Sequence, residues 1–334
     1  MKIVSILWVF LLVLPLACQR SAGVGDDSES EDTDTVTETI DTATISDSAS
    51  SEPGSDRDTD TDTSTVDSDT LTDTGSDTEP LPDPVENEWI FIEGGSFDMG
   101  SELYEYSQPV HTVAVPSFEI LKTEVTVHQY GQCVDAGECS VPHDFSEDST
   151  NYCDPSWYRN NWYEPYKLNF PVNCIDYFQA GEYCAWIGGR LPSEAEWEYT
   201  ARGGGQNIEY PWGDEYPTCE LVAAWDGLDN YTNGDCWSFE QPVCSKPSGN
   251  SFHGLCDMSG NYEEWVADRV RVQFGYEFAP TDGTAWNMDD YGNAGVRGGY
   301  YYNAGSSLSV YIRNSENIYS DSAESITVRC VRNL

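Results

Sequence analysis

Hydrophobic residues along this chain are confined to a short run at its start and to a long carboxyl-terminal part. The run Ile3–Leu16 is apolar, whereas residues 21–87 contain 46 Ser, Thr, Asp or Glu among 67 positions and no aromatic residue. So little apolar surface cannot offset the entropy lost on ordering, so we expect residues 18–87 to form a disordered tether. Residues 88–334 hold 41 of the 43 aromatic residues and are predicted to form one folded domain.

Three short helices are predicted in the domain from a recurrent polar pattern. A capping side chain precedes a Gln or Glu by three residues in the pairs Thr126 with Gln129, Asp176 with Gln179, and Ser193 with Glu196. At this spacing each side chain accepts a hydrogen bond from a backbone N–H that the helix leaves free. We therefore expect helices at about 126–136, 176–187 and 193–202.

Outside the predicted helices the apolar runs are short and the loops are long. Examples of such runs are Trp89–Ile92 and Thr112–Val115, and Gly, Trp, Tyr and Asn are frequent between them. Short apolar runs between turn residues are typical of strands. The pattern therefore predicts an irregular, loop-rich α+β domain.

The amino-terminal run is an export signal rather than part of the fold. Lys2 precedes Ile3–Leu16, which is too short to span a bilayer, so residues 1–17 are predicted to be a signal peptide. The segment Leu-Pro-Leu-Ala-Cys that ends at Cys18 resembles the bacterial lipobox, which implies a lipid anchor on Cys18. An ordinary cleaved signal with an incidental cysteine is the alternative. With the lipid, we expect the protein at the bacterial cell envelope, on the outer membrane or the cell surface.

Charge excludes one class of partner. The chain has 59 acidic against 15 Lys and Arg residues, a net charge of -44, and residues 21–87 contain only one base, Arg57. Because no basic stripe offsets phosphate repulsion, nucleic acid is not an expected partner. The strongly negative net charge attracts cations instead.

The cysteine count agrees with export. Of eleven cysteines, ten remain after Cys18, and an even number in an exported chain predicts disulfides, although the sequence alone leaves the pairing open. Zinc is not expected, because the four histidines are scattered and no Cys-x-x-Cys motif is present.

Six motifs then occur in a fixed order along the domain. They are FIEGGSFDMGS at 91–101, EVT at 124–126, GRLPSEAEWEY at 189–199, YPWGD at 210–214, GLCDMSGNYEEW at 254–265, and RGG at 297–299. This succession resembles the formylglycine-generating enzyme family, the sulfatase-modifying factor domain, across the whole folded part. The resemblance implies a single disulfide-bonded α+β domain similar to the C-type lectin superfamily, with structural calcium.

The same resemblance predicts that the family's copper site is absent. The enzymes oxidise a cysteine in a sulfatase peptide, using oxygen and a copper ion held by two thiolates four and nine residues after the second glycine of the RGG motif. Those positions are Asn303 and Leu308 here, and neither side chain supplies the soft thiolate that Cu(I) needs. Copper is therefore not expected, no catalytic residue is assigned, and the remaining pocket candidates are Glu263, Tyr300, Asn303 and Arg313.

The scaffold features of the family are retained. Carried over by resemblance, calcium would be held by Asp257 and Glu264 with the carbonyl oxygens of Gly260 and Tyr262, all within one loop. The alternative is that the two carboxylates only cap the turn. The resemblance also pairs Cys184 with Cys330.

The other disulfides are inferred only from proximity in the sequence. This reasoning pairs Cys133 with Cys139, Cys219 with Cys236, and Cys244 with Cys256, and it leaves Cys153 for Cys174.

We therefore expect an extracytoplasmic lipoprotein whose domain is a binding or structural module. A peptide or a glycan is the expected ligand, stacked on loop aromatics such as Trp286, Tyr300, Tyr301 and Tyr302. The alternative is an oxidoreductase of the sulfatase-modifying type, or a related metal-dependent enzyme, with an altered active site. A third possibility is a structural surface component in which the acidic tether carries the function.

Overall fold

A computed structural model describes most of the predicted domain. The described residues are 83–142, 153, 161–225, 239–270, 272–288, 292–319 and 323–334. The predicted signal peptide, Cys18, most of the tether and Cys236 lie outside these ranges, so the predictions made for them stay predictions. None of the helices in the described ranges combines the length and apolar character needed to cross a bilayer.

The predicted helices are present, and each begins at the predicted cap. They are α1 Val127–Asp135, α2 Tyr177–Trp186 and α3 Glu194–Ala201. In all three the N-cap side chain accepts from the backbone N–H three residues later, and the Gln or Glu at that position accepts from the N-cap backbone in return. This reciprocal pairing satisfies two donors that a helix start otherwise leaves free, which explains why short helices form here.

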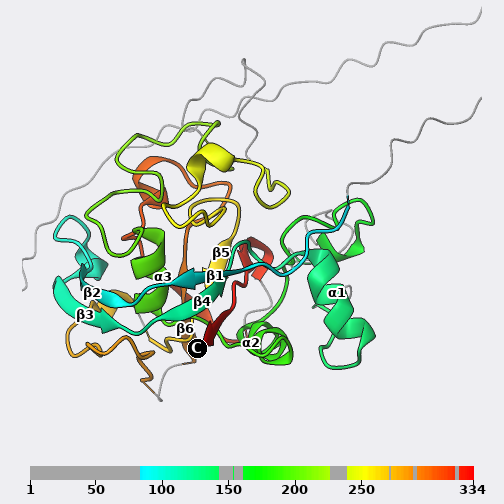
Figure 1. Cartoon of the computed structure of the whole chain (residues 1–334), viewed down its shortest axis with the longest axis horizontal. Coiled ribbons are helices and arrows are strands. Elements are labelled where there is room, and N and C mark those ends of the chain that lie inside the picture. Colours follow the sequence, from blue (N-terminus) through cyan, green and yellow to red (C-terminus); the bar gives the residue numbers. More distant parts are fainter. Residues whose placement is uncertain are drawn as a thin grey trace, which may run out of the picture. The chain divides into compact units, whose positions relative to one another are not determined.

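The strands of the described part form three small sheets (Figure 1). In the first sheet β4 lies between β1 and β9, and the second is the hairpin of β2 and β3. The third runs in the order β7, β6, β5, β8, and its β5–β8 pair is parallel. The strand bounds are β1 Trp89–Ile92, β2 Gly95–Met99, β3 His111–Val115, β4 Phe118–Leu121, β5 Glu263–Trp265, β6 Asn293–Arg297, β7 Asn314–Asn317, β8 Ile326–Thr327 and β9 Val331–Asn333. The observed mixture of short helices and strands confirms the predicted α+β class.

Helix α3 lies beside the β2–β3 hairpin and is buried on all sides (Figure 1). Its acidic side chains therefore need cationic partners inside the protein. Glu194 accepts from Arg313 at 2.6 Å, and Glu198 accepts from Arg297 at 2.7 Å and Arg202 at 2.9 Å. Burial alone would raise the pKa of Glu194, but Arg313 and Arg297 outweigh it and lower that pKa.

Disulfides link cysteines that lie from 6 to 146 residues apart along the chain. The structure contains the bonds Cys133–Cys139, Cys153–Cys174, Cys184–Cys330 and Cys244–Cys256. These four pairs agree with the expected pairing. Cys219 is also disulfide-bonded, but its predicted partner Cys236 lies outside the described residues.

Contacts to the domain begin slightly before the predicted boundary at residue 88. Asn169 Nδ2 donates to the Asp83 carbonyl oxygen, and Val85 N donates to Asn169 Oδ1, each at 2.9 Å. The composition of residues 21–87 does not reveal this, because a single asparagine supplies both hydrogen bonds. Residues 83 and 85 therefore contact the folded domain.

Candidate functional site

The turn after β6 brings together the two positions predicted to have lost copper. Gly298 and Gly299 follow the end of β6 with positive φ angles of 99° and 68°. A Cβ atom on Gly299 would lie 2.9 Å from Asn303 Oδ1 and 3.3 Å from Leu308 Cδ2. The side chains of Asn303 and Leu308 therefore lie beside the same glycine. Two side chains that hold a single ion need such proximity.

Neither residue at this turn is a ligand that Cu(I) prefers. Asn303 Oδ1 accepts a hydrogen bond from Tyr300 N at 2.9 Å. Leu308 is 0 % exposed and packs in a small apolar cluster with Tyr210, Val222 and Ala224. The turn is thus filled by an amide and an aliphatic side chain, where soft sulfur would be required.

Free thiols are also absent from the described part of the chain. Every cysteine described there is disulfide-bonded, namely Cys133, Cys139, Cys153, Cys174, Cys184, Cys219, Cys244, Cys256 and Cys330. Three potential ligand groups do lie close together at Cys244, Cys256 and Asp257, but the two sulfur atoms are bonded to each other. Within the described ranges, no thiolate is therefore left to hold a metal.

Aromatic side chains surround the turn. Tyr301 is buried, and its ring centroid lies 5.6 Å from that of Tyr300 and 4.8 Å from that of Tyr302. Trp225 N donates to the Tyr301 carbonyl at 2.8 Å, and the Tyr216 hydroxyl lies against the backbone at Gly305. The exposed members of this set, with 60, 39 and 42 % of their surface accessible, are Tyr216, Trp225 and Tyr302, which we call the aromatic face.

Trp286, which the sequence grouped with these aromatics, is engaged elsewhere. Its backbone N–H donates to Asp268 Oδ1, and its carbonyl accepts from Arg269 N, each at 2.9 Å. Asp268 Oδ2 in turn accepts from Glu194 N. The Trp286 backbone therefore joins its loop to the region of Asp268 at the start of α3.

The other pocket candidates are buried in separate hydrogen-bond pairs. Glu263 Oε1 accepts from Asn314 Nδ2 at 2.6 Å, and burial raises the pKa of Glu263 to about 7. Arg313 donates to both oxygens of Glu194, at 2.6 and 2.7 Å. The structure therefore brings Tyr300 and Asn303 together but does not place Glu263 and Arg313 with them.

A cluster of three buried carboxylates lies at the loop that the resemblance marks for calcium. Asp257 lies in the loop, Glu264 lies in β5 directly after it, and Glu124 lies two residues before the N-cap of α1. Glu124 accepts from Asn261 Nδ2 at 2.8 Å and from Tyr262 N at 3.1 Å. Burial, then the repulsion of Asp257 and Glu264, raises the pKa of Glu124 well above its usual range.

The donors at this loop match calcium in type, but the group of ligand atoms that lie within 4.8 Å of one another in the described residues is that of Cys244, Cys256 and Asp257. Burial also raises the pKa of Asp257, to about 6. Arg329 pairs with Glu264 at 2.7 Å and is the guanidinium that lies beside all three carboxyl groups. Carboxylate and carbonyl oxygens are the ligands that calcium prefers. Trp197 Nε1 also donates to Glu264, at 2.8 Å, so an ion here would share that carboxylate with existing partners.

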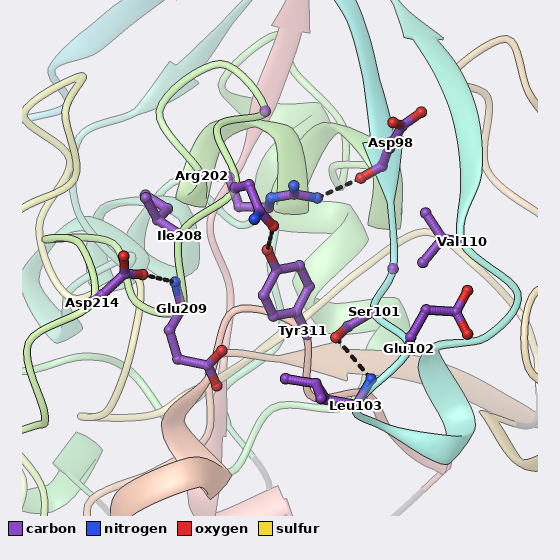
Figure 2. Close-up of a pocket in the computed structure, with 13 residues that line it drawn as sticks. Asp98, Ser101, Glu102, Leu103, Val110, Arg202, Ile208, Glu209, Asp214 and Tyr311 are labelled. Carbon is purple, nitrogen blue, oxygen red and sulfur yellow. Dashed lines mark hydrogen bonds between the residues drawn. The ribbon is translucent and has the colours of Figure 1, made fainter.

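A cavity of about 510 Å³ opens around Arg202 and Tyr311 (Figure 2). The turn 100–103 forms one wall, and the segment 205–209 with Asp214 forms another. Asn303, Leu308 and the aromatic face do not line it. The cavity is therefore distinct from the turn after β6.

Sequence reasoning missed Glu124, Arg329 and Arg202. Glu124 lies inside a recognised motif, two residues before the N-cap Thr126, but its partner loop is 137 residues away along the chain. Arg202 follows Glu198 by four residues, a spacing that predicts an ion pair on one helix face, whereas Arg329 has no such local signal. A count of buried acids against available bases would have been the signal to look for such partners.

The comparisons with known proteins agree with the motifs. Residues 76–334 match the family model described as Sulfatase-modifying factor enzyme 1-like domain. The chain is 33 % identical over 221 residues to the formylglycine-generating enzyme of Mycobacterium tuberculosis, covering 54 % of this chain and 73 % of the enzyme. It is 36 % identical over 124 residues to the inactive C-alpha-formylglycine-generating enzyme 2 of Mus musculus, covering 36 % of this chain and 39 % of that protein.

The chain is also similar to part of a longer protein and to a solved structure. The chain is 34 % identical over 200 residues to the serine/threonine-protein kinase Pkn1 of Chlamydia trachomatis, covering 59 % of this chain but only 30 % of the kinase. It thus spans less than a third of the first curated relatives that it matches. The structure of PvdO from Pseudomonas aeruginosa superposes with a TM-score of 0.59 at 26 % identity, covering 76 % of this chain and 100 % of PvdO.

Proposed function

Because the chain belongs to the sulfatase-modifying factor family, we propose that it is an exported binding module whose copper oxidase site has been lost. One observation carries this proposal. Asn303 and Leu308 meet at Gly299, in the place where the resemblance puts the two copper thiolates. An amide and a buried aliphatic side chain do not bind Cu(I).

The ligand would rest on the aromatic face. Tyr216, Trp225 and Tyr302 expose large rings beside the same turn, and such rings stack on sugar rings or on flat peptide groups. A peptide or a glycan is therefore the proposed ligand class. The buried Tyr301 supports the face from beneath through its contacts with Tyr300 and Tyr302.

Calcium would stabilise this scaffold rather than take part in chemistry. Asp257 and Glu264 would supply carboxylate oxygens, and Gly260 and Tyr262 carbonyl oxygens. When bound, the ion would favour the ionised form of Asp257, whose pKa burial raises. Glu124 would be held beside it through Asn261 and the Tyr262 backbone.

The proposed location is the bacterial cell envelope. A lipid on Cys18 would anchor the chain, and the acidic segment after it would hold the domain away from the membrane, because like charges extend a chain. The ten remaining cysteines support an oxidising compartment.

The alternative is a sulfatase-modifying oxidoreductase, or a related metal-dependent enzyme, with a rebuilt site. One relative is named formylglycine-generating enzyme, which favours this alternative, and another is named as inactive, which favours the loss of activity. Glu263, with a pKa raised to about 7 by burial, is the group that an altered site would use for proton transfer.

The test uses the purified protein with Cu(I), oxygen and a peptide that contains a Cys-x-Pro-x-Arg segment. We expect the peptide mass to remain unchanged, since no thiolate is in place to hold copper. Conversion of the cysteine to an aldehyde would overturn the proposal. Binding to peptide and glycan arrays, compared between the protein and a Tyr302→Ala variant, would then identify the ligand of the aromatic face.

A further inference from the structure

Lys167 carries its amine into the interior of the domain. The residue is 7 % exposed, and Nζ donates to Asn161 Oδ1 at 2.9 Å and to Glu240 Oε1 at 2.5 Å. The side chains of Lys167 and Glu240 are 9 and 13 % exposed. Nζ also lies 5.5 Å from the centroid of the Phe170 ring. An amine, a carboxylate and a carboxamide therefore meet in a place from which most of the solvent is excluded.

Lys122 also pairs with a glutamate, but its setting is different. Its Nζ donates to Glu88 at 2.9 Å, and the two side chains are 33 and 58 % exposed. Solvent stabilises both charges of such a surface pair. The pair of Lys167 with Glu240 has lost most of this solvation, and taking two charges out of water is costly. Transfer of a proton across the 2.5 Å contact removes both charges and leaves a neutral amine with a free lone pair.

Asn161 is held with its carbonyl oxygen turned toward this amine. The residue is 0 % exposed, and its backbone N–H donates to Asn173 Oδ1 at 2.9 Å. Its Nδ2 donates to the Pro171 carbonyl at 2.9 Å and to the Tyr262 hydroxyl at 3.1 Å. Both amide hydrogens are thus used, so one orientation of the side chain satisfies the network. Because a C=O bond is about 1.2 Å long, Lys167 Nζ lies at most about 4.1 Å from Asn161 Cγ.

We propose that Lys167 and Asn161 join in an isopeptide bond, with Glu240 as the carrier of protons. The lone pair of Nζ attacks Asn161 Cγ, the Nζ–Cγ bond forms, and the Cγ–Nδ2 bond breaks. The two protons that the lysine ammonium loses pass through Glu240 to the departing nitrogen, which leaves as ammonium. Atoms and charge balance, and the step consumes no oxidant, reductant or cofactor.

The fold supplies the proximity that this reaction needs. Amines attack unactivated amides very slowly, but groups fixed in a suitable geometry reach effective concentrations of about 10⁵–10⁸ M. Asn161 begins the 3-10 helix η3 (Asn161–Tyr163), and Lys167 follows it by six residues. The bond closes a covalent ring over residues 161–167. This inference does not depend on the loss of copper, on calcium or on the aromatic face.

Peptide mapping of the full-length protein, after reduction and alkylation of its disulfides, tests the proposal. Trypsin cleaves after a free lysine, so an unlinked chain gives the separate peptides 160–167 and 168–190. The bond blocks this cleavage, and we expect one peptide, 160–190, about 17 Da lighter than its sequence requires because ammonia has left. Chymotryptic cleavage of that peptide after Tyr163 should leave its two parts joined.

Either of two results would overturn the bond itself. One is cleavage at Lys167 into two peptides of unmodified mass. The other is a loss of about 17 Da from a peptide that trypsin still cleaves after Lys167, because an asparagine that closes on its own backbone also releases ammonia but leaves the lysine free.

A Glu240→Gln variant tests the proton carrier. The amide keeps the size of the side chain, and its oxygen can still accept from the amine, but it does not take up a proton. We expect the linked peptide to decrease at least about tenfold, since a placed acid–base group contributes about 10²–10⁴ in rate. Glu88→Gln is the matched control, because it makes the same change in the exposed pair with Lys122, and it should leave the linked fraction unchanged.

Melting temperatures of the two variants show whether each has folded. Equal linkage in Glu240→Gln and in the wild type would overturn the role of Glu240. Equal loss of linkage in the two variants would overturn it as well, because the loss would then not be specific to the buried pair.

Discussion

Arg329 and Glu264 form an ion pair in the interior of the domain, with Nη2 and Oε1 2.7 Å apart and both side chains at most 1 % exposed. Arg329 also donates to the carbonyl oxygens of Leu121, Lys122 and Cys256. It therefore joins the end of β4, the loop around Cys256 and strand β5 to one guanidinium.

Replacing Arg329 by Gln is expected to destabilise the protein strongly. Glu264 would lose its charge partner beside two further buried carboxylates, and breaking a buried pair from one side costs about 3–5 kcal/mol. Urea unfolding followed by tryptophan fluorescence measures this loss. The control is Arg332→Gln, because the Arg332–Glu119 pair is partly exposed and such pairs contribute about 0–1 kcal/mol. Equal losses for the two variants would contradict the central role of Arg329.

Removing calcium is expected to lower the melting temperature of the protein. An ion that binds only the folded state adds about 2.7 kcal/mol at a concentration one hundred times its Kd. Asp257→Asn removes a proposed ligand charge, while its amide oxygen can still accept from Cys244 N. We expect this variant to melt at the same temperature with calcium or with chelator, whereas the wild type shifts. A wild type that does not respond to calcium would contradict the site.

Asp268 is expected to give the stability of the protein a pH dependence. Burial, then the nearby Glu194, raises the pKa of Asp268 to about 7, although its oxygens accept from Trp286 N and Glu194 N. The folded state thus holds a proton that the unfolded state releases near pH 4. The contribution of Asp268 to stability is therefore lost as the pH rises from about 4 to about 7, by at most about 1.4 kcal/mol per pH unit.

Unfolding free energies measured across this pH range check the prediction. The Asp268→Asn variant has no proton to exchange, so its curve should be flatter than that of the wild type, whatever the offset caused by its lost hydrogen bond. Arg313 and Arg297 are paired with Glu194 throughout and do not titrate in this range. The exposed Asp135→Asn change should leave the slope as it is in the wild type. Parallel curves for Asp268→Asn and wild type would contradict the prediction.

The features that the sequence predicts well are local ones. The three helices begin where capping boxes lie, because both members of each pair are three residues apart and need no distant partner. The proximity of Asn303 and Leu308 to one glycine is local in the same way, since both come from one turn; their assignment as lost copper positions stays a prediction. In contrast, Glu194 meets Arg313 across 119 residues and Glu264 meets Arg329 across 65.

The cavity and the burial of α3 also depend on contacts between residues that are far apart in the sequence, so the sequence did not predict them. The helix carries Glu at positions 194, 196 and 198, a residue type that is usually exposed, yet all of its residues are buried. Arg202 pairs with Glu198 at the end of the helix itself, but Arg297 and Arg313 reach Glu198 and Glu194 only through tertiary packing. The cavity walls come from the turn 100–103 and the segment 205–209, and no periodicity in the chain connects the two. Pairing with buried arginines therefore explains why α3 can be buried, which its local helix propensity does not reveal.

Restoring thiolates at the turn after β6 is expected to restore copper binding. In the double variant Asn303→Cys with Leu308→Cys, both sulfur atoms would lie around Gly299, where the present side chains already meet. Two adjacent thiolates are the soft ligands that Cu(I) prefers. Competition with a coloured Cu(I) chelator should show one tightly bound ion per molecule in the double variant and none in the wild type. The Leu308→Cys variant alone is the control, since it removes the same apolar packing but supplies one thiolate, and it should bind more weakly. If the double variant and this control retain copper equally, the two positions do not form one site, and the assignment of the lost copper ligands is wrong.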